Sequence, residues 1–389
     1  MTPEAYLERV RALLPALRER AMPAERQRRL PDETLKDFQE AGLFRAVQPE
    51  RYGGYELDLA TFHRAVMEIG TVCGSSAWVL AVVGIHNWQL GLFHPQAQED
   101  VWHDDTSVLL STSMAPTGTA ECVDGGFRLR GRWSFSSGCD FCQWAVLGAM
   151  VPATQAGEPP AMCTFLVPRS DYTIDDNWYV MGLCATGSKD IVIEDAFVPE
   201  YRSLMYLDMF YLRYPGMKVN TGPLYRLPFG SVFPYCIVTP AIGAARGALN
   251  AFREQTQTRV TTRDNARVAE DPFAQCTLAE AAAAVDAAQE RVLHNFAEML
   301  GLACAGQEIP LAYRARYRWD AAKAIDWSVG AVDRLLQASS GRVVFLSNPI
   351  QRAWRDVHAM RAHVGNNLEK AAAVFGRSEL GLPPQDFRF

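Results

Sequence analysis

The hydrophobic residues of this chain follow three patterns in succession, and the first extends over residues 1–107. In residues 7–17, leucine and valine recur every three or four positions, which is typical of a helix with one buried face. A proline at position 31 favours the start of a second helix. Residues 75–93, SSAWVLAVVGIHNWQLGLF, are apolar almost throughout, which predicts a helix buried on all sides. This block is therefore predicted to be an N-terminal helical domain.

The second pattern, in residues 108–203, consists of short runs rich in β-branched and aromatic residues. Examples are GGFRLRGRWSFSSG at 125–138, QWAVLGAMV at 143–151 and KDIVIEDAFVP at 189–199, separated by Gly, Pro and Asp. Such runs predict strands joined by tight turns. We expect a compact middle domain of antiparallel strands that closes as a β-barrel.

The third pattern returns to helical spacing in residues 236–389, after an irregular region at 204–235. Residues 278–303 and 313–337 carry strong helix formers over many turns, which predicts a C-terminal four-helix bundle with apolar surface left for subunit contacts. The run 206–230 is rich in Tyr, Met, Phe and Pro. We expect this run either to cover a bulky apolar substrate or to pack at a subunit interface, and the sequence does not separate the two.

Composition narrows the class of protein. Of the 389 residues, 49% are hydrophobic and 21% are charged, as in soluble globular proteins. The net charge of −6 gives no electrostatic reason to expect nucleic acid or an anionic membrane as a partner. No apolar run approaches the roughly 20 residues that span a bilayer, and the first 20 residues carry too many charges for a signal peptide. We therefore expect a cytoplasmic protein without a membrane partner.

Three local motifs indicate little chemistry by themselves. The nine cysteines are dispersed and odd in number, which favours reduced thiols; the CxxC of Cys139 and Cys142 stands alone, so buried thiols are favoured over a redox or metal site. GLCATGSKD, at 182–190, approaches a phosphate-binding loop but has Ser188 where that motif needs lysine, so we interpret it as a turn between strands. No GxGxxG motif occurs, so no nicotinamide site is expected.

Four segments resemble the acyl-CoA dehydrogenase superfamily and occur in the same order as there. They are LPDETLKDFQEAGLF at 30–44, PERYGGYELDL at 49–59, MGLCATGSKDIVIEDAFVP at 181–199 and AWRDVHAMRAHVGNN at 353–367. The resemblance covers nearly the whole chain. It implies an α+β, acyl-CoA dehydrogenase-like fold with an N-terminal helical domain, a middle antiparallel β domain and a C-terminal four-helix bundle.

The last of these segments departs from the dehydrogenases at the position of their base. Dehydrogenases commonly carry a glutamate there, just before a glycine, and its carboxylate removes the α-proton of the substrate. Val364 stands at that place, before Gly365, and a valine cannot accept a proton. The preceding residue, His363, makes the chain resemble the flavin-dependent phenol ortho-hydroxylases, which are the oxygenase components of two-component monooxygenases. The similarity is greatest to the hydroxylases of bacterial steroid breakdown.

This resemblance implies a reaction and its participants. Reduced FMN, with FAD as a second option, would react with O₂ to give a flavin C4a-hydroperoxide that hydroxylates a phenol ortho to its hydroxyl group. A secosteroid phenol is the first choice of substrate, and a simple phenol of the p-hydroxyphenylacetate type is the second. Because no nicotinamide site is expected, a separate flavin reductase should supply the reduced flavin. The fold implies a homotetramer.

The same resemblance assigns roles to individual residues. His363 is expected to accept the phenol proton or to regulate it, since its ordinary pKa of about 6.5 suits neutral pH. His86 is expected to bind the phenolic oxygen, although a histidine on an apolar helix is otherwise most often a satisfied core group. Ser137 should accept the hydrogen bond of flavin N5–H, where the alternative is a polar turn. Ser113 is expected to contact the phenol.

Further residues are expected to bind the cofactor. Arg259 resembles the arginine that binds the flavin phosphate in this family, a bidentate contact that a guanidinium suits; Arg263 and a purely solvated role for Arg259 are the alternatives. The full set expected around the flavin is Trp78, Thr112, Ser113, Met114, Phe135, Ser136, Ser137, Arg259, Gly341, Arg342, His363 and Val364. His358 and the remaining histidines are expected to be structural.

Two other readings stay open at this point. One is an acyl-CoA dehydrogenase with tightly bound FAD, against which Val364 counts. The other is a non-catalytic scaffold on the same fold, which should bind no flavin in either oxidation state.

Overall fold

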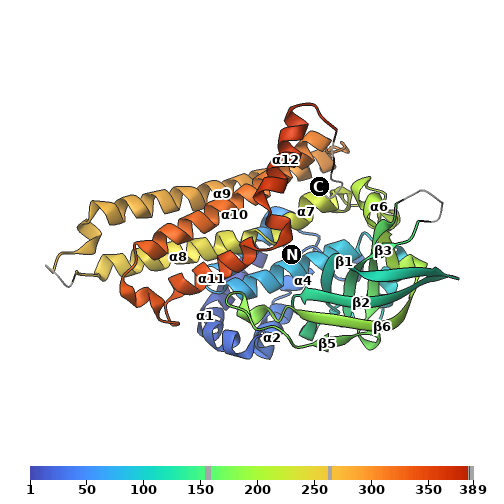
Figure 1. Ribbon diagram of the computed structural model, residues 1–389, viewed down its shortest axis with the longest axis horizontal. Coiled ribbons are helices and arrows are strands. Elements are labelled where there is room, and N and C mark those ends of the chain that lie inside the picture. Colours follow the sequence, from blue (N-terminus) through green and yellow to red (C-terminus); the bar gives the residue numbers. More distant parts are fainter. Residues whose placement is uncertain (154–158, 262–264, 384, 386–389) are drawn as a thin grey trace.

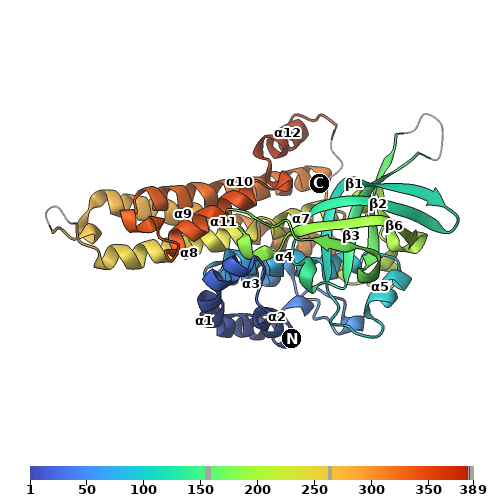
Figure 2. The same ribbon diagram turned by 60° about the horizontal axis from the view of Figure 1, so that its bottom comes forward.

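The computed structural model describes residues 1–153, 159–261, 265–383 and 385. Its N-terminal part is helical, as predicted, and Figure 1 shows it below the helical bundle. The helices are α1 (Pro3–Gln27), α2 (Asp32–Glu40), α3 (Leu59–Gly70), α4 (Gly74–Leu90) and α5 (Pro95–Trp102). All residues of α4 are buried, which confirms the predicted buried helix. This helix lies between the bundle and the β-sheet and touches both (Figures 1 and 2).

The middle of the chain forms one seven-stranded sheet with the order β5-β6-β2-β1-β3-β4-β7. Its strands are β1 (Leu110–Val123), β2 (Gly126–Ser136), β3 (Trp144–Val151), β4 (Ala161–Pro168), β5 (Thr173–Asp175), β6 (Lys189–Pro199) and β7 (Ser203–Met205). β5 and β7 are the two edges of this sheet in the described part of the chain, so the expected closure into a barrel does not appear in the strand order.

One pair of strands differs from the predicted antiparallel pattern. β1 and β3 are parallel, whereas the other strand pairs of the described chain are antiparallel. The reason is the path of the chain: β2 turns back on one side of β1, and the next strand, β3, passes to the other side of β1 before it pairs. A strand that reverses direction twice runs parallel to the first. The expectation of a purely antiparallel domain was therefore wrong at this pair.

The C-terminal part confirms the predicted four-helix bundle. Its long helices are α8 (Thr239–Thr258), α9 (Pro272–Cys304), α10 (Leu311–Gln337) and α11 (Pro349–Arg361), which lie side by side in Figures 1 and 2. α12 (Leu368–Glu379) follows the bundle helices and packs against α10, where Phe375 stacks on Trp319. The short helices α6 (Tyr206–Phe210) and α7 (Phe229–Cys236) bound the irregular run that precedes the bundle.

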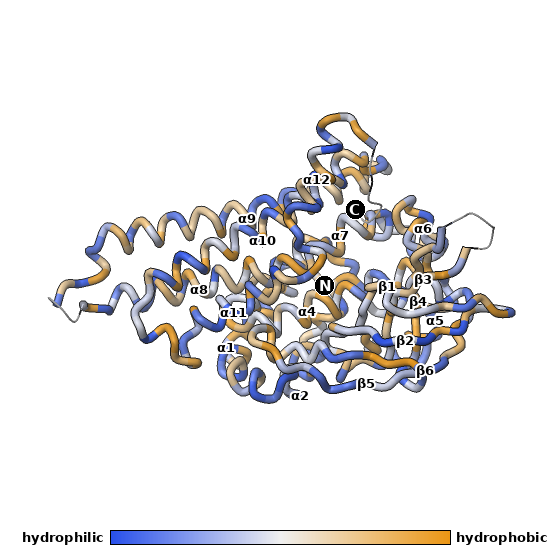
Figure 3. Tube along the Cα trace, in the orientation of Figure 1, coloured by the Kyte–Doolittle hydropathy of each residue, from blue (hydrophilic) through white to orange (hydrophobic). Residues whose placement is uncertain are grey.

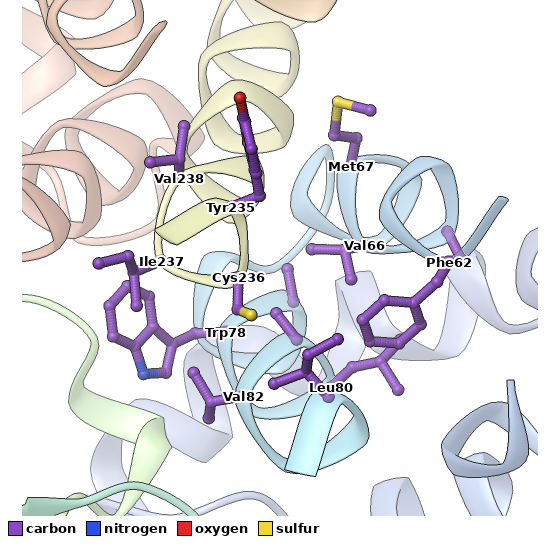
Figure 4. Close-up of a cluster of buried hydrophobic side chains, with 14 of the residues drawn as sticks. Phe62, Val66, Met67, Trp78, Leu80, Val82, Tyr235, Cys236, Ile237 and Val238 are labelled. Carbon is purple, nitrogen blue, oxygen red and sulfur yellow. The ribbon is translucent and has the colours of Figure 1, made fainter. Parts of the chain in front are cut away.

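Part of the main hydrophobic core lies where α3, α4 and the α7–α8 junction meet, as Figure 4 shows. In Figure 3, α4 is coloured mainly as hydrophobic, while α9 at the edge of the bundle mixes hydrophobic and hydrophilic residues. Residues Phe229–Thr258 are long and apolar enough to cross a membrane, but 83% of their most apolar window is buried inside the fold. Such burial is what the central helix of a globular core requires.

Candidate active site

Trp78, Ser137 and His363 come together from three distant parts of the chain. The indole Nε1–H of Trp78, on α4, donates a hydrogen bond of 3.0 Å to Ser137 Oγ, just beyond the end of β2. The ring of His363 lies against the same indole, with 6.1 Å between ring centroids and a tilt of 57°. Trp78 also lies beside Ile237 in Figure 4, and the carbonyl of Ile237 accepts a 3.2 Å hydrogen bond from the Asn366 side chain. These contacts fix the turn that carries His363.

His363 has a defined proton position. Its Nδ1 accepts a hydrogen bond of 2.9 Å from the backbone N–H of Gly365, so the neutral imidazole carries its proton on Nε2. The side chain is half-buried, and burial, helped by the positive charge of Arg318, lowers the pKa of His363 to about 4. His363 is therefore neutral at pH 7 and offers an N–H donor. Its neighbour Val364 is 70% exposed and has no acid–base chemistry.

His86 is held in the opposite way. Its Nδ1 lies 2.9 Å from Gln89 Oε1, an oxygen that only accepts, so Nδ1 carries the proton and Nε2 is the acceptor nitrogen. The Thr112 hydroxyl lies 2.7 Å from that Nε2 and donates to it. Burial lowers the pKa of His86 to about 3, so this histidine is also neutral at pH 7. His86 is thus hydrogen-bonded at both ring nitrogens, as expected of a histidine in the core. One of its partners, however, is Thr112, a half-buried residue of the predicted flavin loop.

The loop around Thr112 is tied to its surroundings by two contacts. Ser113 Oγ donates a hydrogen bond of 2.7 Å to the carbonyl of Ser134 on β2, so its hydroxyl proton is already committed and only its lone pairs can serve a ligand. The sulfur of Met114 lies 3.5 Å from Gln89 Nε2 and 3.8 Å from the Tyr206 hydroxyl. Met114 therefore lies beside Gln89 and Tyr206, next to the His86 cluster.

Aromatic rings from both ends of the irregular run 206–230 reach the same cluster. Phe233 stacks on His86 with 6.0 Å between centroids, and Phe229 stacks on Phe233 at 5.3 Å. Tyr206 packs edge-on against Phe229. These contacts place apolar rings beside His86, which favours the substrate-side interpretation of the run over the subunit-interface one.

Two residues next to Ser137 have features that a bound ring would explain. Phe135 is 70% exposed and has a left-handed backbone with φ of +68°, which costs an aromatic residue about 1 kcal/mol or more. The Ser136 hydroxyl is buried and has no hydrogen-bond partner among the described residues. An exposed Phe135 and Val364 beside such polar atoms suit a flat ligand with an apolar face and a polar edge.

The residues predicted to bind phosphate lie at the far end of the bundle. Arg259 Nη2 lies 3.4 Å from the Ala338 carbonyl, close to the loop of Gly341 and Arg342. Arg342 lines a surface cavity of about 500 Å³ together with Gln255, Phe345, Ser347, Asn348 and Pro349. The 13-residue α11 separates this cavity from His363, which corresponds to about 20 Å. Within one chain, therefore, the residues predicted to bind phosphate do not lie beside the cluster of Trp78, Ser137 and His363. Arg263 lies outside the described residues.

Sequence reasoning missed three residues of the site. Gln89 follows His86 by three positions on a helix, so helical spacing alone could have revealed it. Thr186 and Ser188 belong to a segment that we correctly read as a turn, but their place beside Ser137 follows from the pairing of β2 with β6, in which Ser136 lies opposite Lys189. Strand register of this kind is not visible in the sequence.

His358 and the two cysteines of the CxxC motif have surroundings that suit a structural role. His358 Nε2 lies 2.9 Å from Asp333 Oδ1, between α10 and α11 and away from the cluster around Trp78. Cys139 and Cys142 are buried, and burial raises the pKa of both thiols, so they are poor nucleophiles. All nine cysteines are free, and the described residues contain no group of three or more side chains able to hold a metal ion.

Comparison with known proteins supports the fold and identifies the family of the chain. Residues 3–105 match the model of the acyl-CoA dehydrogenase N-terminal domain, and residues 235–368 match that of the C-terminal domain. The flavin-dependent monooxygenase oxygenase subunit HsaA of Rhodococcus jostii (strain RHA1) is 44% identical over 98% of this chain and 99% of its own length. This chain belongs to the oxygenase subunits of flavin-dependent monooxygenases.

Other members of this monooxygenase family agree with that assignment. The crystal structure of 3-HSA hydroxylase from Rhodococcus sp. RHA1 matches with a TM-score of 0.95, covering 99% of this chain and 98% of that one at 44% identity. The oxygenase component of an FADH₂-dependent resorcinol hydroxylase from Rhizobium sp. (strain MTP-10005) is 36% identical over 97% of this chain and 94% of its own. The monooxygenase is thus a flavoprotein with an acyl-CoA dehydrogenase fold, and it works with a separate component that supplies reduced flavin.

Proposed function

We propose that this monooxygenase uses reduced FMN and O₂ to hydroxylate a phenol ortho to its hydroxyl group, with a secosteroid phenol as the preferred substrate. The observation that carries the proposal is the buried, neutral His86, whose Nε2 accepts the hydroxyl proton of Thr112 beside a cluster of aromatic side chains. A simple phenol such as p-hydroxyphenylacetate is the second choice. The relatives named for 3-HSA and for resorcinol support a phenolic substrate.

The residues around Trp78 fit a flavin ring. Ser137 has a lone pair that could accept a hydrogen bond from the edge of the ring, and Phe135 and Val364 offer exposed apolar surface. The Ser136 hydroxyl, which has no partner among the described residues, could bind a polar atom of the ring. Thr112, Ser113 and Met114 would line the side of the ring that faces the substrate. When bound and reduced, the flavin reacts with O₂ and supplies the oxygen atom that is transferred. FMN rather than FAD remains part of this proposal.

His86 and Thr112 would receive the phenolic hydroxyl group. A phenolate is more electron-rich at its ortho carbon than a phenol, so any group that draws the proton away favours oxygen transfer. The pKa of His86 is about 3 and that of a phenol is about 10, so His86 gains the proton only while the phenolate remains beside it. The negative charge of the phenolate raises the pKa of the imidazole. The Gln89 oxygen on Nδ1 keeps the Nε2 lone pair directed at the Thr112 hydroxyl, through which the phenol proton would reach His86.

The role of His363 changes accordingly. The sequence predicts that His363 accepts the phenol proton or regulates it. Because the Gly365 N–H occupies Nδ1, the group that His363 can offer to a ligand is its Nε2–H donor. We therefore assign His363 the regulating role: it donates a hydrogen bond to an oxygen that becomes negative during the reaction. The proton-accepting role passes to His86. The geometry thus provides one acceptor and one donor, both neutral at pH 7.

Arg259, Gly341 and Arg342 would serve the flavin of a neighbouring subunit. They lie about 20 Å from His363 along α11, which is too far for a phosphate attached to the same flavin ring. Exposed Val344, Phe345 and Leu346 adjoin them, and exposed apolar side chains in a row are typical of subunit contacts. We propose a homotetramer in which this loop closes on the partner's cofactor.

One experiment tests the proposed function. The protein is mixed anaerobically with FMNH₂ and a series of phenols, O₂ is then admitted, and hydroxylated product and H₂O₂ are measured. We expect coupled product formation with a multi-ring phenol. Release of H₂O₂ alone with every phenol would refute the proposal. So would a purified protein that retains stoichiometric FAD and reduces it with an acyl-CoA.

A further inference from the structure

A chain of hydroxyl groups leads from Trp78 into the turn at 183–188. Ser137 Oγ lies 2.7 Å from Ser188 Oγ, and Ser188 Oγ lies 2.7 Å from Thr186 Oγ1. Thr186 Oγ1 in turn lies 2.9 Å from the carbonyl oxygen of Leu183. The three hydroxyls are at least 92% buried, because Ser137, Ser188 and Thr186 are 8%, 4% and 1% exposed. Bulk water therefore does not compete for these bonds.

The direction of every hydrogen bond in this chain follows from its last member. A carbonyl oxygen only accepts, so Thr186 must donate its single hydroxyl proton to Leu183. Thr186 then accepts from Ser188, and Ser188 accepts from Ser137. The proton of Ser137 is thereby directed away from the site, while the indole of Trp78 donates to one of its lone pairs. Ser137 is left with one lone pair and no proton, so it can only accept.

The end of the chain is firmly anchored. The Leu183 carbonyl also accepts a 3.2 Å hydrogen bond from the indole of Trp178. The Leu183 N–H donates a 2.7 Å hydrogen bond to the buried carboxylate of Asp356, and Leu183 adopts a left-handed backbone with φ of +56°. A Cβ on Gly182 would lie 2.1 Å from the Arg355 carbonyl, so the turn lies directly on α11. The turn cannot shift without breaking these contacts, which keeps the carbonyl in place.

We propose that Thr186 and Ser188 are positioning residues that make the site select reduced over oxidised flavin. The argument rests on the proposed function, which places Ser137 at flavin N5. Reduced flavin carries a hydrogen on N5 and can donate to Ser137, whereas oxidised flavin has a lone pair there and meets the Ser137 lone pair. A Ser137 that cannot turn its proton toward N5 therefore binds the reduced form and rejects the oxidised one. Such a preference lets spent flavin leave and fresh reduced flavin enter.

The test is the ratio of the Kd for oxidised FMN to the Kd for reduced FMN, measured by anaerobic and aerobic titration. In Thr186→Val, Ser188 loses its acceptor and donates to Ser137, whose proton then turns toward N5. We expect the ratio to fall about tenfold or more, because the oxidised flavin gains a hydrogen bond between its N5 and Ser137 and the reduced flavin loses one. Ser188→Ala should act in the same direction, and Thr186→Ser, which retains the hydroxyl, should restore the wild-type ratio.

Controls separate this role from a structural one. Thr164→Val removes a buried threonine hydroxyl that also donates to a carbonyl, that of Leu204 at 3.0 Å, and it should leave the ratio unchanged. In a Ser137→Ala background, Thr186→Val should have no further effect on the ratio. A wild-type ratio in both folded Thr186→Val and folded Ser188→Ala proteins would overturn the proposal while leaving the proposed function standing. A wild-type protein that binds neither form of FMN would overturn both.

Discussion

Replacing Gln89 with leucine tests the acceptor role of His86 without touching either histidine. Gln89 is fully buried, and its Oε1 accepts the Nδ1–H of His86 at 2.9 Å. Without that oxygen the proton is free to move to Nε2, where it would point at the Thr112 hydroxyl and prevent that hydroxyl from donating to His86. The imidazole would then present a donor where the reaction needs an acceptor.

The size of the effect follows from the lost bond. A buried N–H left without its acceptor costs about 1–3 kcal/mol. If the proton moves to Nε2, this cost is avoided, but returning the proton to Nδ1 for the reaction then costs the same amount of free energy. Hydroxylation should therefore be about 5 to 150 times slower. The binding of reduced flavin should stay nearly unchanged, because Gln89 contacts His86 and Met114 and not the Trp78–Ser137 pair.

The assay is a single-turnover measurement of product formed per reduced flavin consumed, followed over time after O₂ is admitted. Gln98→Leu is the matched control, since Gln98 is also fully buried but bonds to the carbonyls of Gly91 and Phe93. We expect slow hydroxylation and more H₂O₂ in Gln89→Leu only. Hydroxylation at the wild-type rate in a folded Gln89→Leu protein would refute the assignment of His86 as acceptor.

Three other changes have defined outcomes. His363→Ala should slow hydroxylation about tenfold or more through loss of a donor to a developing charge, with little change in reduced-flavin affinity; equal turnover by both proteins between pH 6 and 9 would contradict its role. Ser137→Ala should release more H₂O₂ per flavin consumed, and an equal peroxide yield would remove Ser137 from the mechanism. Burial lowers the pKa of His63 to about 3 in the folded protein. As the pH falls below about 6.5, the unfolded chain therefore binds a proton at His63 that the folded protein does not, and the free energy of unfolding decreases. In His63→Gln, the loss of unfolding free energy between pH 7 and pH 5 should therefore shrink by up to about 2 kcal/mol, and denaturant titrations with an undiminished loss would contradict this sign.

Much of the fold could be predicted because its signals are local. The buried α4 follows from an apolar run, and the bundle helices follow from long stretches of helix-forming residues. The parallel pairing of β1 with β3 could not be predicted, since it depends on which side of β1 the chain passes. The order of the strands in the sheet could not be predicted either, because it is a property of the whole domain.

The candidate site divides in a similar way. The inert Val364 and the neighbouring His363 are readable from the sequence, and so is the family that they indicate. The proton positions of His86 and His363 are not, because each is set by one contact, with Gln89 in the first case and with the Gly365 N–H in the second. The separation of Arg342 from His363 also needed the structure, because the sequence assigns both to one cofactor.

The fate of dioxygen tests the central claim most directly. The protein is loaded anaerobically with FMNH₂ and a multi-ring phenol, isotopically labelled O₂ is admitted, and the product is analysed by mass spectrometry. The account predicts one labelled oxygen atom on the ring carbon next to the original hydroxyl group, in an amount approaching that of the flavin oxidised. A product without label, or labelled H₂O₂ as the sole product with every phenol, would contradict it.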